Sequence, residues 1–274
     1  MPELPEVETI RRQLEPLLTG SKISSIEVLD PLAVAPASPE AFKRRLRGRA
    51  ITAVRRRGKY LQLELDTQDT LVIHLRMTGT LTYLQLPMPK EERQRLRLLL
   101  HLDNGAGLAF HDTRRFGKAF ILKAGDSQRY WARLGPEPLD SSFKAAYLGK
   151  ILDGRTRPIK SLLLDQAMVA GIGNIYADEA LYRAHIMPTR PAGDLDDEEI
   201  RRLTRSIKAT LKKAIDLQGS SIDTYRDSQG RKGSFQETFQ VHRRQGEPCP
   251  ACGTRVEKIR VGGRGTYFCP ICQK

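Results

Sequence analysis

A chain of 274 residues is long enough for two domains, each with a sizeable hydrophobic core. Its 46 Lys and Arg against 32 Asp and Glu give a net charge of +14, a surplus that favours a nucleic-acid partner over a membrane surface. The sequence has no apolar run of the roughly 20 residues that span a bilayer, and no signal peptide at its start. We therefore expect a cytoplasmic protein without a membrane partner.

The stretch from residue 4 to residue 18 has the periodicity of an amphipathic helix. Prolines in its first turn cost no hydrogen bond, and the acids there suit the helix dipole. If Met1 is removed, Pro2 has a free secondary amine beside the carboxyl of Glu3. On local physics alone the stretch is simply a helix, and a chemical role for Pro2 needs support from elsewhere. The apolar positions of the predicted helix are Leu4, Val7, Ile10, Leu14 and Leu17.

Short strands are predicted through the rest of the first 130 residues or so. Turn residues separate them, and this spacing is typical of an antiparallel sandwich or barrel. We expect one of these two folds, with the first helix packed against it, and a short helix at 38–47. The predicted strands are 21–29, 60–65, 70–75, 80–84, 95–102, 107–111 and 119–123.

A block of nine Lys and Arg without an acid lies between Phe42 and Leu63. Such a run usually forms a solvated face. Here it ends in Gly58 and Lys59, directly before the strand that begins at Tyr60. A turn entering a strand can also hold one amine at a sheet edge, facing a groove, so both interpretations stay open.

The pattern becomes helical after the segment 134–139, which is predicted to be a linker. We expect helices at 141–153, 157–168, 175–184 and 196–217, the last capped by Asp194 or Asp196. The polar, Gly-rich stretch 218–236 is predicted to be a long mobile loop. Loops of this length are more often functional or disordered than structural.

Four cysteines near the C-terminus have the spacing of a four-thiolate zinc site. Cys249-x2-Cys252 and Cys269-x2-Cys272 are separated by sixteen residues. Two disulfides are the alternative, which a cytoplasmic location disfavours. Four ligands leave no open position, so the Zn²⁺ is expected to be structural. Arg264, in a glycine-rich turn between the cysteine pairs, either meets a phosphate or is merely solvated.

Three other features allow both a structural and a functional interpretation. Asn174 follows two glycines at a helix start, where N–H groups can cradle a phosphate, although an ordinary turn explains it equally well. Arg114 and Phe116 either wedge bases apart or form a surface turn. Met77 by itself predicts a core residue. The absence of a P-loop and of a dinucleotide fingerprint argues against a nucleotide cofactor.

Taken together, the motifs resemble one family over essentially the whole chain, the bacterial formamidopyrimidine-DNA glycosylases. The resemblance implies a multi-domain α+β fold, with a β-sandwich and N-terminal catalytic helix, a helix–two-turns–helix domain and a zinc-finger hairpin. The expected boundaries are 1–133, 134–222, 223–236 for the lesion-capping loop (beginning near 218) and 237–274. The motifs are Met1-Pro-Glu-Leu-Pro-Glu-Val-Glu-Thr9, Arg57-Gly-Lys-Tyr60, His74-Leu-Arg-Met-Thr-Gly79, Arg114-Arg-Phe-Gly117, Gly171-Ile-Gly-Asn-Ile-Tyr-Ala-Asp-Glu179 and the four-Cys segment.

The resemblance also implies chemistry, the removal of 8-oxoguanine and ring-opened purines from duplex DNA with cleavage of the strand. Pro2 matches the nucleophile that forms a Schiff base with the sugar, and Glu3 the proton donor to the ring oxygen. Lys59 matches a cation assigned to β-elimination, and Arg264 a finger residue that grips phosphates and assists δ-elimination. The expected protein is a nucleoid-associated monomer bound to damaged double-stranded DNA.

Further residues match positions that contact DNA in the family. Because the target base must leave the helix, a trio of side chains fills the vacated space. That trio matches Met77, Arg114 and Phe116. Backbone phosphates are expected at Arg155, Lys160 and Asn174. The loop that closes over the flipped base matches Ser220, Ser221, Thr224 and Tyr225.

Three positions depart from the family's pattern. Arg95 and Arg97 stand where many members have His-x-His, so phosphate contact at Arg95 is expected but not inherited. His242 replaces a Tyr that commonly meets the backbone. Thr78 replaces a Glu that contacts the flipped base in some relatives, which puts details of base recognition in doubt.

Two other functions agree with parts of the sequence. A sister enzyme of endonuclease VIII type would act on oxidised pyrimidines, but such chains usually begin Pro-Glu-Gly-Pro-Glu, whereas residue 4 here is Leu. A non-catalytic zinc-ribbon DNA-binding protein would explain the charge and the cysteines. It would not explain the Pro2–Glu3 start.

Overall fold

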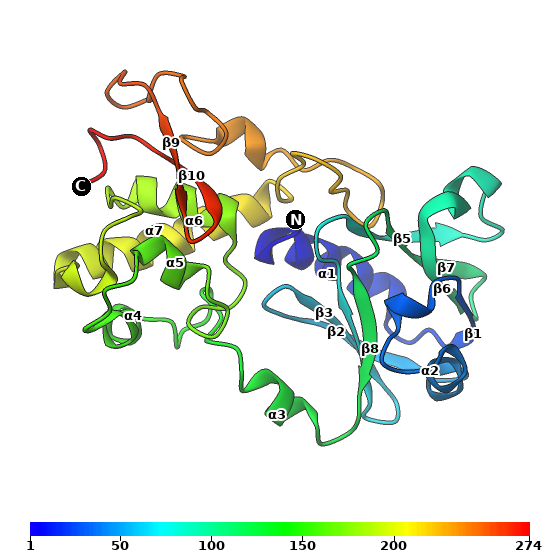
Figure 1. Cartoon of the computed structure of the whole chain (residues 1–274). Helices are drawn as coiled ribbons and strands as arrows, with labels where there is room; N and C mark the ends of the chain where they lie inside the picture. Colours follow the sequence, from blue (N-terminus) through cyan, green and yellow to red (C-terminus); the bar gives the residue numbers. More distant parts are fainter. The chain divides into compact units, whose positions relative to one another are not determined.

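The computed structural model describes all 274 residues, and the chain divides into two compact units (Figure 1). The first unit comprises Met1–Ala132 with Gln218–Ser234, and the second comprises Arg133–Leu217 with Phe235–Lys274. None of the helices is both long enough and apolar enough to cross a bilayer.

Two antiparallel sheets form the frame of the first unit. Its strands are β1 (Ile23–Val28), β2 (Ile51–Arg57), β3 (Tyr60–Leu65), β4 (Thr70–His74), β5 (Gly79–Gln85), β6 (Leu96–Leu102), β7 (Ala106–Asp112) and β8 (Lys118–Leu122). One four-stranded sheet has the order β1-β6-β7-β5 and the other β2-β3-β4-β8. The predicted sandwich is therefore confirmed.

Alternating side chains on the strands build the core of this sandwich. In β3, Leu61, Leu63 and Leu65 are buried and the residues between them are not, as period-two alternation requires. They share one hydrophobic cluster with Leu98 and Leu100 of β6 in the other sheet.

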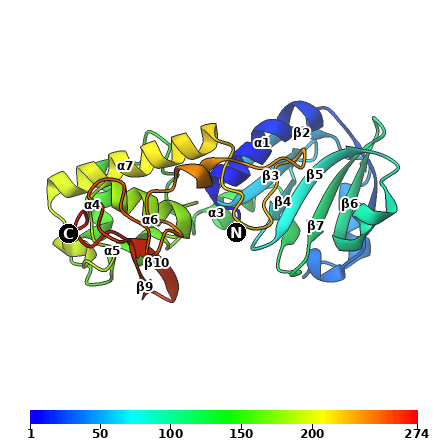
Figure 2. The same ribbon diagram turned by 90° about the horizontal axis from the view of Figure 1, so that it is seen from above.

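The helix α1 (Leu4–Leu18) joins that cluster and packs on β2 (Figure 2). Leu18, four residues after Leu14, closes its buried face, whereas the predicted Leu17 is only half-buried. The other helical segments of the unit are α2 (Pro39–Leu46), α3 (Ser127–Trp131) and the 3-10 turns η1 (Pro31–Ala33) and η2 (Lys90–Arg95).

The second unit is mainly helical. Its elements are α4 (Ala145–Leu152), α5 (Ile159–Leu163), α6 (Asn174–Arg183), α7 (Asp197–Asp216), η3 (Ala192–Asp194), η4 (Phe235–Thr238) and a hairpin of β9 (Glu257–Val261) and β10 (Arg264–Phe268). The longest helix, α7, packs against α4 and α6. It begins at a capping box. The Asp196 carboxylate accepts from the N–H of Glu199 at 2.8 Å, and the Glu199 carboxylate accepts from the N–H of Asp196 at 2.9 Å.

The helix predicted at 157–168 is shorter in the structure, because α5 ends at Leu163. The Gln166 side chain explains the early end. Its amide donates to the carbonyls of Leu164 and Ile172, and its oxygen accepts from Gly171. These bonds turn the chain toward α6 instead of continuing the helix.

The segment 218–234 forms no helix or strand, but its backbone is anchored to the first unit. Ser220 and Ser234 form an isolated bridge that brings the two ends of the segment together. Between them, Ser228 accepts from the N–H of Tyr83 on β5 at 3.0 Å and bonds to Gln13 of α1 at 2.8 Å.

Candidate active site

Pro2 and Glu3 are buried immediately before α1. Glu3 is the N-cap residue, with extended backbone, and its N–H donates to the Glu6 carboxylate at 2.8 Å. This bond fixes the backbone of Glu3, the candidate acid, at the start of the helix. Met1, directly ahead of the buried Pro2, is 38% exposed.

The other carboxylate oxygen of Glu6 holds the segment 218–234. It accepts from the N–H of Ser220 at 2.8 Å, and the Tyr225 hydroxyl donates to the Glu6 carbonyl at 3.4 Å. Burial, followed by the charge of Glu6, raises the pKa of Tyr225, so its phenol stays a neutral donor. Gly219, with φ +79°, lies where a Cβ would come within 2.8 Å of the Glu6 carboxylate. One acid therefore joins the N-terminus to this segment.

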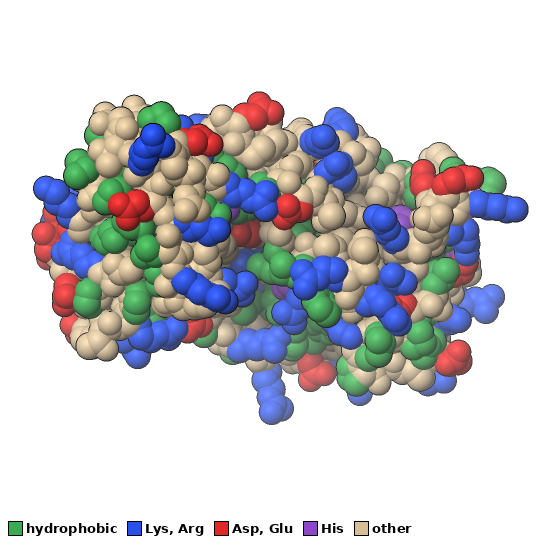
Figure 3. Space-filling view, turned by 45° about the horizontal axis from the view of Figure 1, so that its top comes forward, with side chains coloured by type: hydrophobic (Ala, Val, Ile, Leu, Met, Phe, Trp, Pro, Cys, Tyr) green, Lys and Arg blue, Asp and Glu red, His purple; other side chains and the backbone are tan.

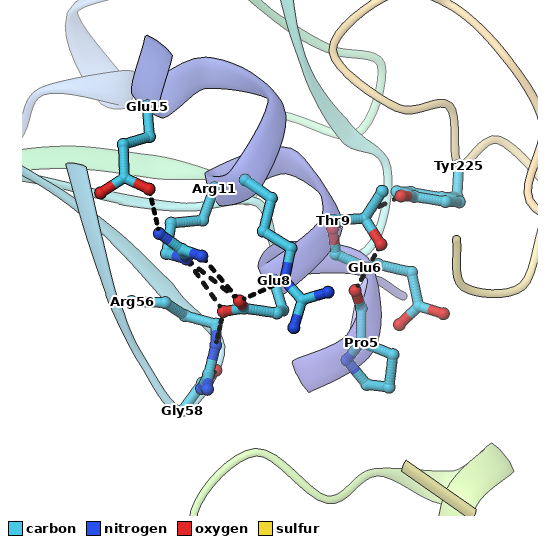
Figure 4. A network of polar contacts seen from close by, with 10 residues as sticks. Pro5, Glu6, Glu8, Thr9, Arg11, Glu15, Arg56, Gly58 and Tyr225 are labelled. Carbon is cyan, nitrogen blue, oxygen red and sulfur yellow. Dashed lines mark hydrogen bonds and ion pairs between the residues drawn. The ribbon is translucent and has the colours of Figure 1, made fainter. Parts of the chain in front are cut away.

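A cluster of arginines around Glu8 ties α1 to the turn that carries Lys59 (Figure 4). The Nε of Arg56, on β2, donates to Glu8 at 3.0 Å, and its Nη1 donates to the carbonyl of Gly58 at 3.0 Å. Burial opposes the charge of Glu8, yet hydrogen bonds and charges of Arg11 and Arg56 lower its pKa overall. Lys59, in the β2–β3 turn, is only 7% exposed.

His74 ends β4 opposite Tyr60, and the two rings meet edge to face at 4.5 Å. Its Nδ1 accepts from the N–H of Arg76 at 3.0 Å. Burial, then the positive charges of Arg76 and Lys59, lower the pKa of His74 to about 3. The imidazole beside Lys59 is therefore neutral near pH 7.

The three expected wedge residues lie on two loops at one end of a sheet. The loop with Met77 enters β5 and the loop with Arg114 and Phe116 leaves β7, whose last residue pairs with the first residue of β5. Arg114 places its guanidinium 4.8 Å from the centre of the Phe116 ring, and both side chains are exposed. Met77 is half-buried and not a full core residue.

The two arginines of the Arg-x-Arg departure lie in different surroundings. Arg95 ends η2 and is exposed. Arg97 is half-buried, and its Nε donates to the carbonyl of Asp112 at 2.8 Å. Of the pair, Arg95 is the one whose side chain faces solvent.

In the second unit, buried polar side chains hold the hairpin backbone beside Arg264. Lys160 is fully buried, with its ammonium 2.6 Å from Asp178 and 2.8 Å from the hydroxyl of Thr266. Lys160 and Asn174 both donate to the carbonyl of Gly265, at 3.1 and 2.9 Å. Arg264 itself begins β10 and is exposed, as is Arg155.

The His242 departure is occupied by an internal contact. Its Nδ1 lies 2.7 Å from Asp178, and the side chain is buried. The neighbouring acid, Glu179, accepts from the N–H groups of Gln240, Val241 and His242. The sequence prediction assigned no role to either acid, although two adjacent carboxylates between the apolar segments 175–177 and 180–181 were a usable signal.

The four cysteines fit a zinc ion. All four Sγ atoms lie within 4.8 Å of one another, and none is in a disulfide. The Cys249–Cys272 and Cys252–Cys269 separations are 3.8 and 3.5 Å, close to the ~3.8 Å edge of a tetrahedron with Zn–S bonds of about 2.3 Å. The disulfide alternative is excluded, and the set closes one structural site.

Family models match most of the chain. The formamidopyrimidine-DNA glycosylase N-terminal domain matches residues 1–119, the H2TH domain of the same enzymes matches 134–226, and a zinc finger found in FPG and IleRS matches 246–274. The chain belongs to the formamidopyrimidine-DNA glycosylase family.

Individual relatives agree with this assignment. Proteins named formamidopyrimidine-DNA glycosylase from Chloroflexus aurantiacus and Moorella thermoacetica are 47% and 49% identical to the chain, over 100% and 95% of it and 98% and 95% of their own lengths. The solved structure of a Lactococcus lactis FPG mutant with DNA containing Fapy-dG is 40% identical, with a TM-score of 0.93 and full coverage of both chains. The Lactococcus lactis Fpg complex with abasic-site DNA gives 0.92 at 40% identity and 99% coverage of each chain.

Membership of the formamidopyrimidine-DNA glycosylase family makes this protein a DNA-binding glycosylase of DNA repair with a zinc finger. The charge of the surface agrees with that role. Lys and Arg side chains outnumber Asp and Glu on the face seen in Figure 3, and the chain as a whole carries +14.

Protonation of His74 is expected to make this glycosylase lose stability in acid. The folded-state pKa of about 3 lies below the ordinary 6.5, so the unfolded chain binds the proton first and stability falls as pH drops from 6.5 toward 3. The contribution is at most ~1.4 kcal/mol per pH unit. His74→Asn keeps an acceptor for the Arg76 N–H without titrating. Urea unfolding at pH 7.5 to 4.5 should therefore show a steeper decline for wild type than for the variant, and parallel curves would contradict it.

Loss of one zinc ligand is expected to unfold the finger of this glycosylase. Binding of structural zinc supplies about 10–16 kcal/mol in zinc-finger peptides, and much of it stabilises the fold. Cys269→Ser should therefore release the metal, measured by mass spectrometry, and make the finger sensitive to limited proteolysis. Ile271→Ser, at a 59% exposed position between the last two ligands, is the control that should keep both properties. A protease-resistant Cys269→Ser finger holding one zinc would refute the assignment.

Proposed function

We propose that the protein is a bifunctional DNA glycosylase and AP lyase that removes 8-oxoguanine and formamidopyrimidines from duplex DNA. The observation that carries the proposal is the buried Pro2–Glu3 start of α1, tied through Glu8 and Arg56 to the turn of Lys59. The solved Lactococcus lactis relatives hold DNA with Fapy-dG or with an abasic site, which supports the same substrate class.

The proposed chemistry begins with the amine of Pro2 after removal of Met1. Its unprotonated nitrogen attacks C1′ of the damaged nucleoside, and the bond from C1′ to the base breaks. The proton that the attacking N–H loses balances the proton that the departing base gains, so the base leaves neutral. Glu3 donates a proton to the sugar ring oxygen as the ring opens, which leaves an iminium between Pro2 and C1′. While Met1 remains, the Pro2 nitrogen is an amide and cannot attack.

Strand cleavage follows by two eliminations from the iminium. Loss of a C2′ proton expels the 3′ phosphate (β-elimination), and we assign Lys59 to this step. A second elimination expels the 5′ phosphate (δ-elimination), with Arg264 at the phosphates. Water then hydrolyses the iminium, which frees the Pro2 amine and releases the sugar remnant as an unsaturated aldehyde. The other products are a free base and a one-nucleoside gap flanked by phosphates.

Recognition of damaged duplex DNA is assigned to side chains of both units. Met77, Arg114 and Phe116 fill the space left by the flipped base, with Arg114 bonding the orphaned cytosine. Exposed Arg95 and Arg155 and the amide of Asn174 meet backbone phosphates. The segment with Ser220, Ser221, Thr224 and Tyr225 covers the flipped base.

The burial of Lys160 changes how we expect it to act on the phosphates. Its ammonium is enclosed by Asp178, Gly265 and Thr266, so we assign it to holding the hairpin that presents Arg264. We also propose that the protein is monomeric and nucleoid-associated and that it uses no nucleotide cofactor. We propose domain boundaries after residues 133, 222 and 236.

Borohydride trapping tests the proposed nucleophile. Reduction should trap the Met-processed protein covalently on a duplex with 8-oxoguanine opposite cytosine, because borohydride reduces an iminium to a stable amine. Pro2→Gly should lower the trapped yield at least tenfold, since the secondary amine is lost. The same assay on thymine glycol should react much more slowly. If wild type is not trapped, the proposed mechanism is wrong. If trapping is faster on thymine glycol, the result supports the endonuclease VIII type of enzyme.

Glu3→Gln separates base excision from lyase chemistry. The amide cannot donate the proton, so excision of 8-oxoguanine should fall at least 100-fold, while cleavage of a preformed abasic site continues. Single-turnover assays on the two duplexes give both rates. If the variant excises the base at the wild-type rate, Glu3 is not the proton donor.

A further inference from the structure

The two loops that carry the proposed wedge residues adjoin neighbouring strands at the same point. Gly79, the first residue of β5, is paired with Asp112, the last residue of β7. Met77 precedes that pair on one strand, and Arg114 and Phe116 follow it on the other. Any bond between Thr78 and the loop after Asp112 therefore joins the two loops directly.

Such a bond exists, centred on the carboxylate of Asp112, which is 1% exposed. Its Oδ1 accepts from the hydroxyl of Thr78 and, at 3.1 Å, from the N–H of Arg114. The Thr78 hydroxyl oxygen also accepts from that N–H at 3.1 Å. Oδ2 accepts from the N–H of Gly117 at 2.7 Å. A single side chain from the Met77 loop thus completes the network that shapes the other loop.

The backbone on either side of this network is closely constrained. Arg115 has φ +60° and forks onto the buried Asp30 at 2.7 and 2.8 Å. A Cβ at Gly117 would come within 2.4 Å of Phe110. On the other loop, the N–H of Gly79 closes onto the carbonyl of Leu75 at 3.0 Å. The hydroxyl of Thr78 forms a side-chain hydrogen bond from one loop to the other. The remaining contacts named here constrain each loop by itself.

We propose that Thr78 is a positioning residue whose hydroxyl, with Asp112, holds Met77 and the Arg114–Phe116 pair as one preorganised wedge. Groups fixed before binding lose less conformational freedom when they enter the base stack. The position thereby acts on extrusion of the lesion and not on the chemistry at the sugar. This inference rests on the proposed function for its effect on DNA, but the loop contact itself does not.

The chain offers conservative variants for the test. Thr78→Val keeps the shape and removes the hydroxyl, while Asp112 retains its bonds to the N–H groups of Arg114 and Gly117, so the fold should persist. Thr78→Ser restores the hydroxyl. Thr80→Val makes the same chemical change two residues further along β5, at a half-buried position with no assigned role.

The experiment measures the loops first without DNA and then with it. Hydrogen exchange of the Arg114 amide should be about tenfold faster in Thr78→Val, because that N–H loses one acceptor. With an 8-oxoguanine duplex carrying 2-aminopurine beside the lesion, unstacking and single-turnover excision should both slow roughly tenfold. Thr78→Ser should recover to within about twofold, and Thr80→Val should match wild type.

A substrate that needs less extrusion separates positioning from general damage. When the 8-oxoguanine faces an abasic site it has no pairing to lose, so the Thr78→Val defect should shrink. The proposal is overturned if Thr78→Val has an equal defect on this substrate. It is also overturned if the variant unstacks a paired 8-oxoguanine at the wild-type rate. If wild type excises nothing while exchange at Arg114 still responds to Thr78→Val, the enzymatic assignment fails and the loop contact stands.

Discussion

The buried ion pair between Glu8 and Arg56 is the constraint on which the geometry of the N-terminal site depends. Both side chains are about one-tenth exposed, so their charges are poorly screened. Removing one partner of such a pair typically costs about 3–5 kcal/mol, because the other charge stays buried. Arg56 also donates to Gly58. The same arginine thus fixes both the helix that begins after Pro2 and Glu3 and the turn that holds Lys59.

The second unit uses the same device with different residues. Asp178, fully buried in α6, lies between the ammonium of Lys160 and the imidazole of His242. Lys160 in turn holds the carbonyl of Gly265, next to Arg264. In both units an internal acid orients a basic side chain, and that basic side chain binds a backbone carbonyl. The two carbonyls, at Gly58 and Gly265, lie next to Lys59 and Arg264, for which we propose roles in strand cleavage.

Local patterns explain which parts of the fold could be predicted from the sequence. The strand at 60–65 matches β3 because its leucines alternate cleanly between core and surface. The strand β2 was missed, since three successive arginines conceal the alternation and only Ile51 and Val54 are fully buried. Contacts between residues far apart in the sequence could not be predicted either. The spacing of four cysteines identifies a metal site, but no local pattern shows that Lys160 is enclosed or that Thr78 reaches Asp112.

The segment 218–234 has a consequence for the topology of the whole chain. It lies between α7 and η4 of the second unit in sequence, yet it belongs to the first unit, so the chain crosses from one unit to the other three times. A fragment ending at residue 132 would therefore lack the backbone that Glu6 and Gln13 hold. The two units are interleaved along the chain and not simply strung together, and the N-terminal unit is complete only once residue 234 has been synthesised.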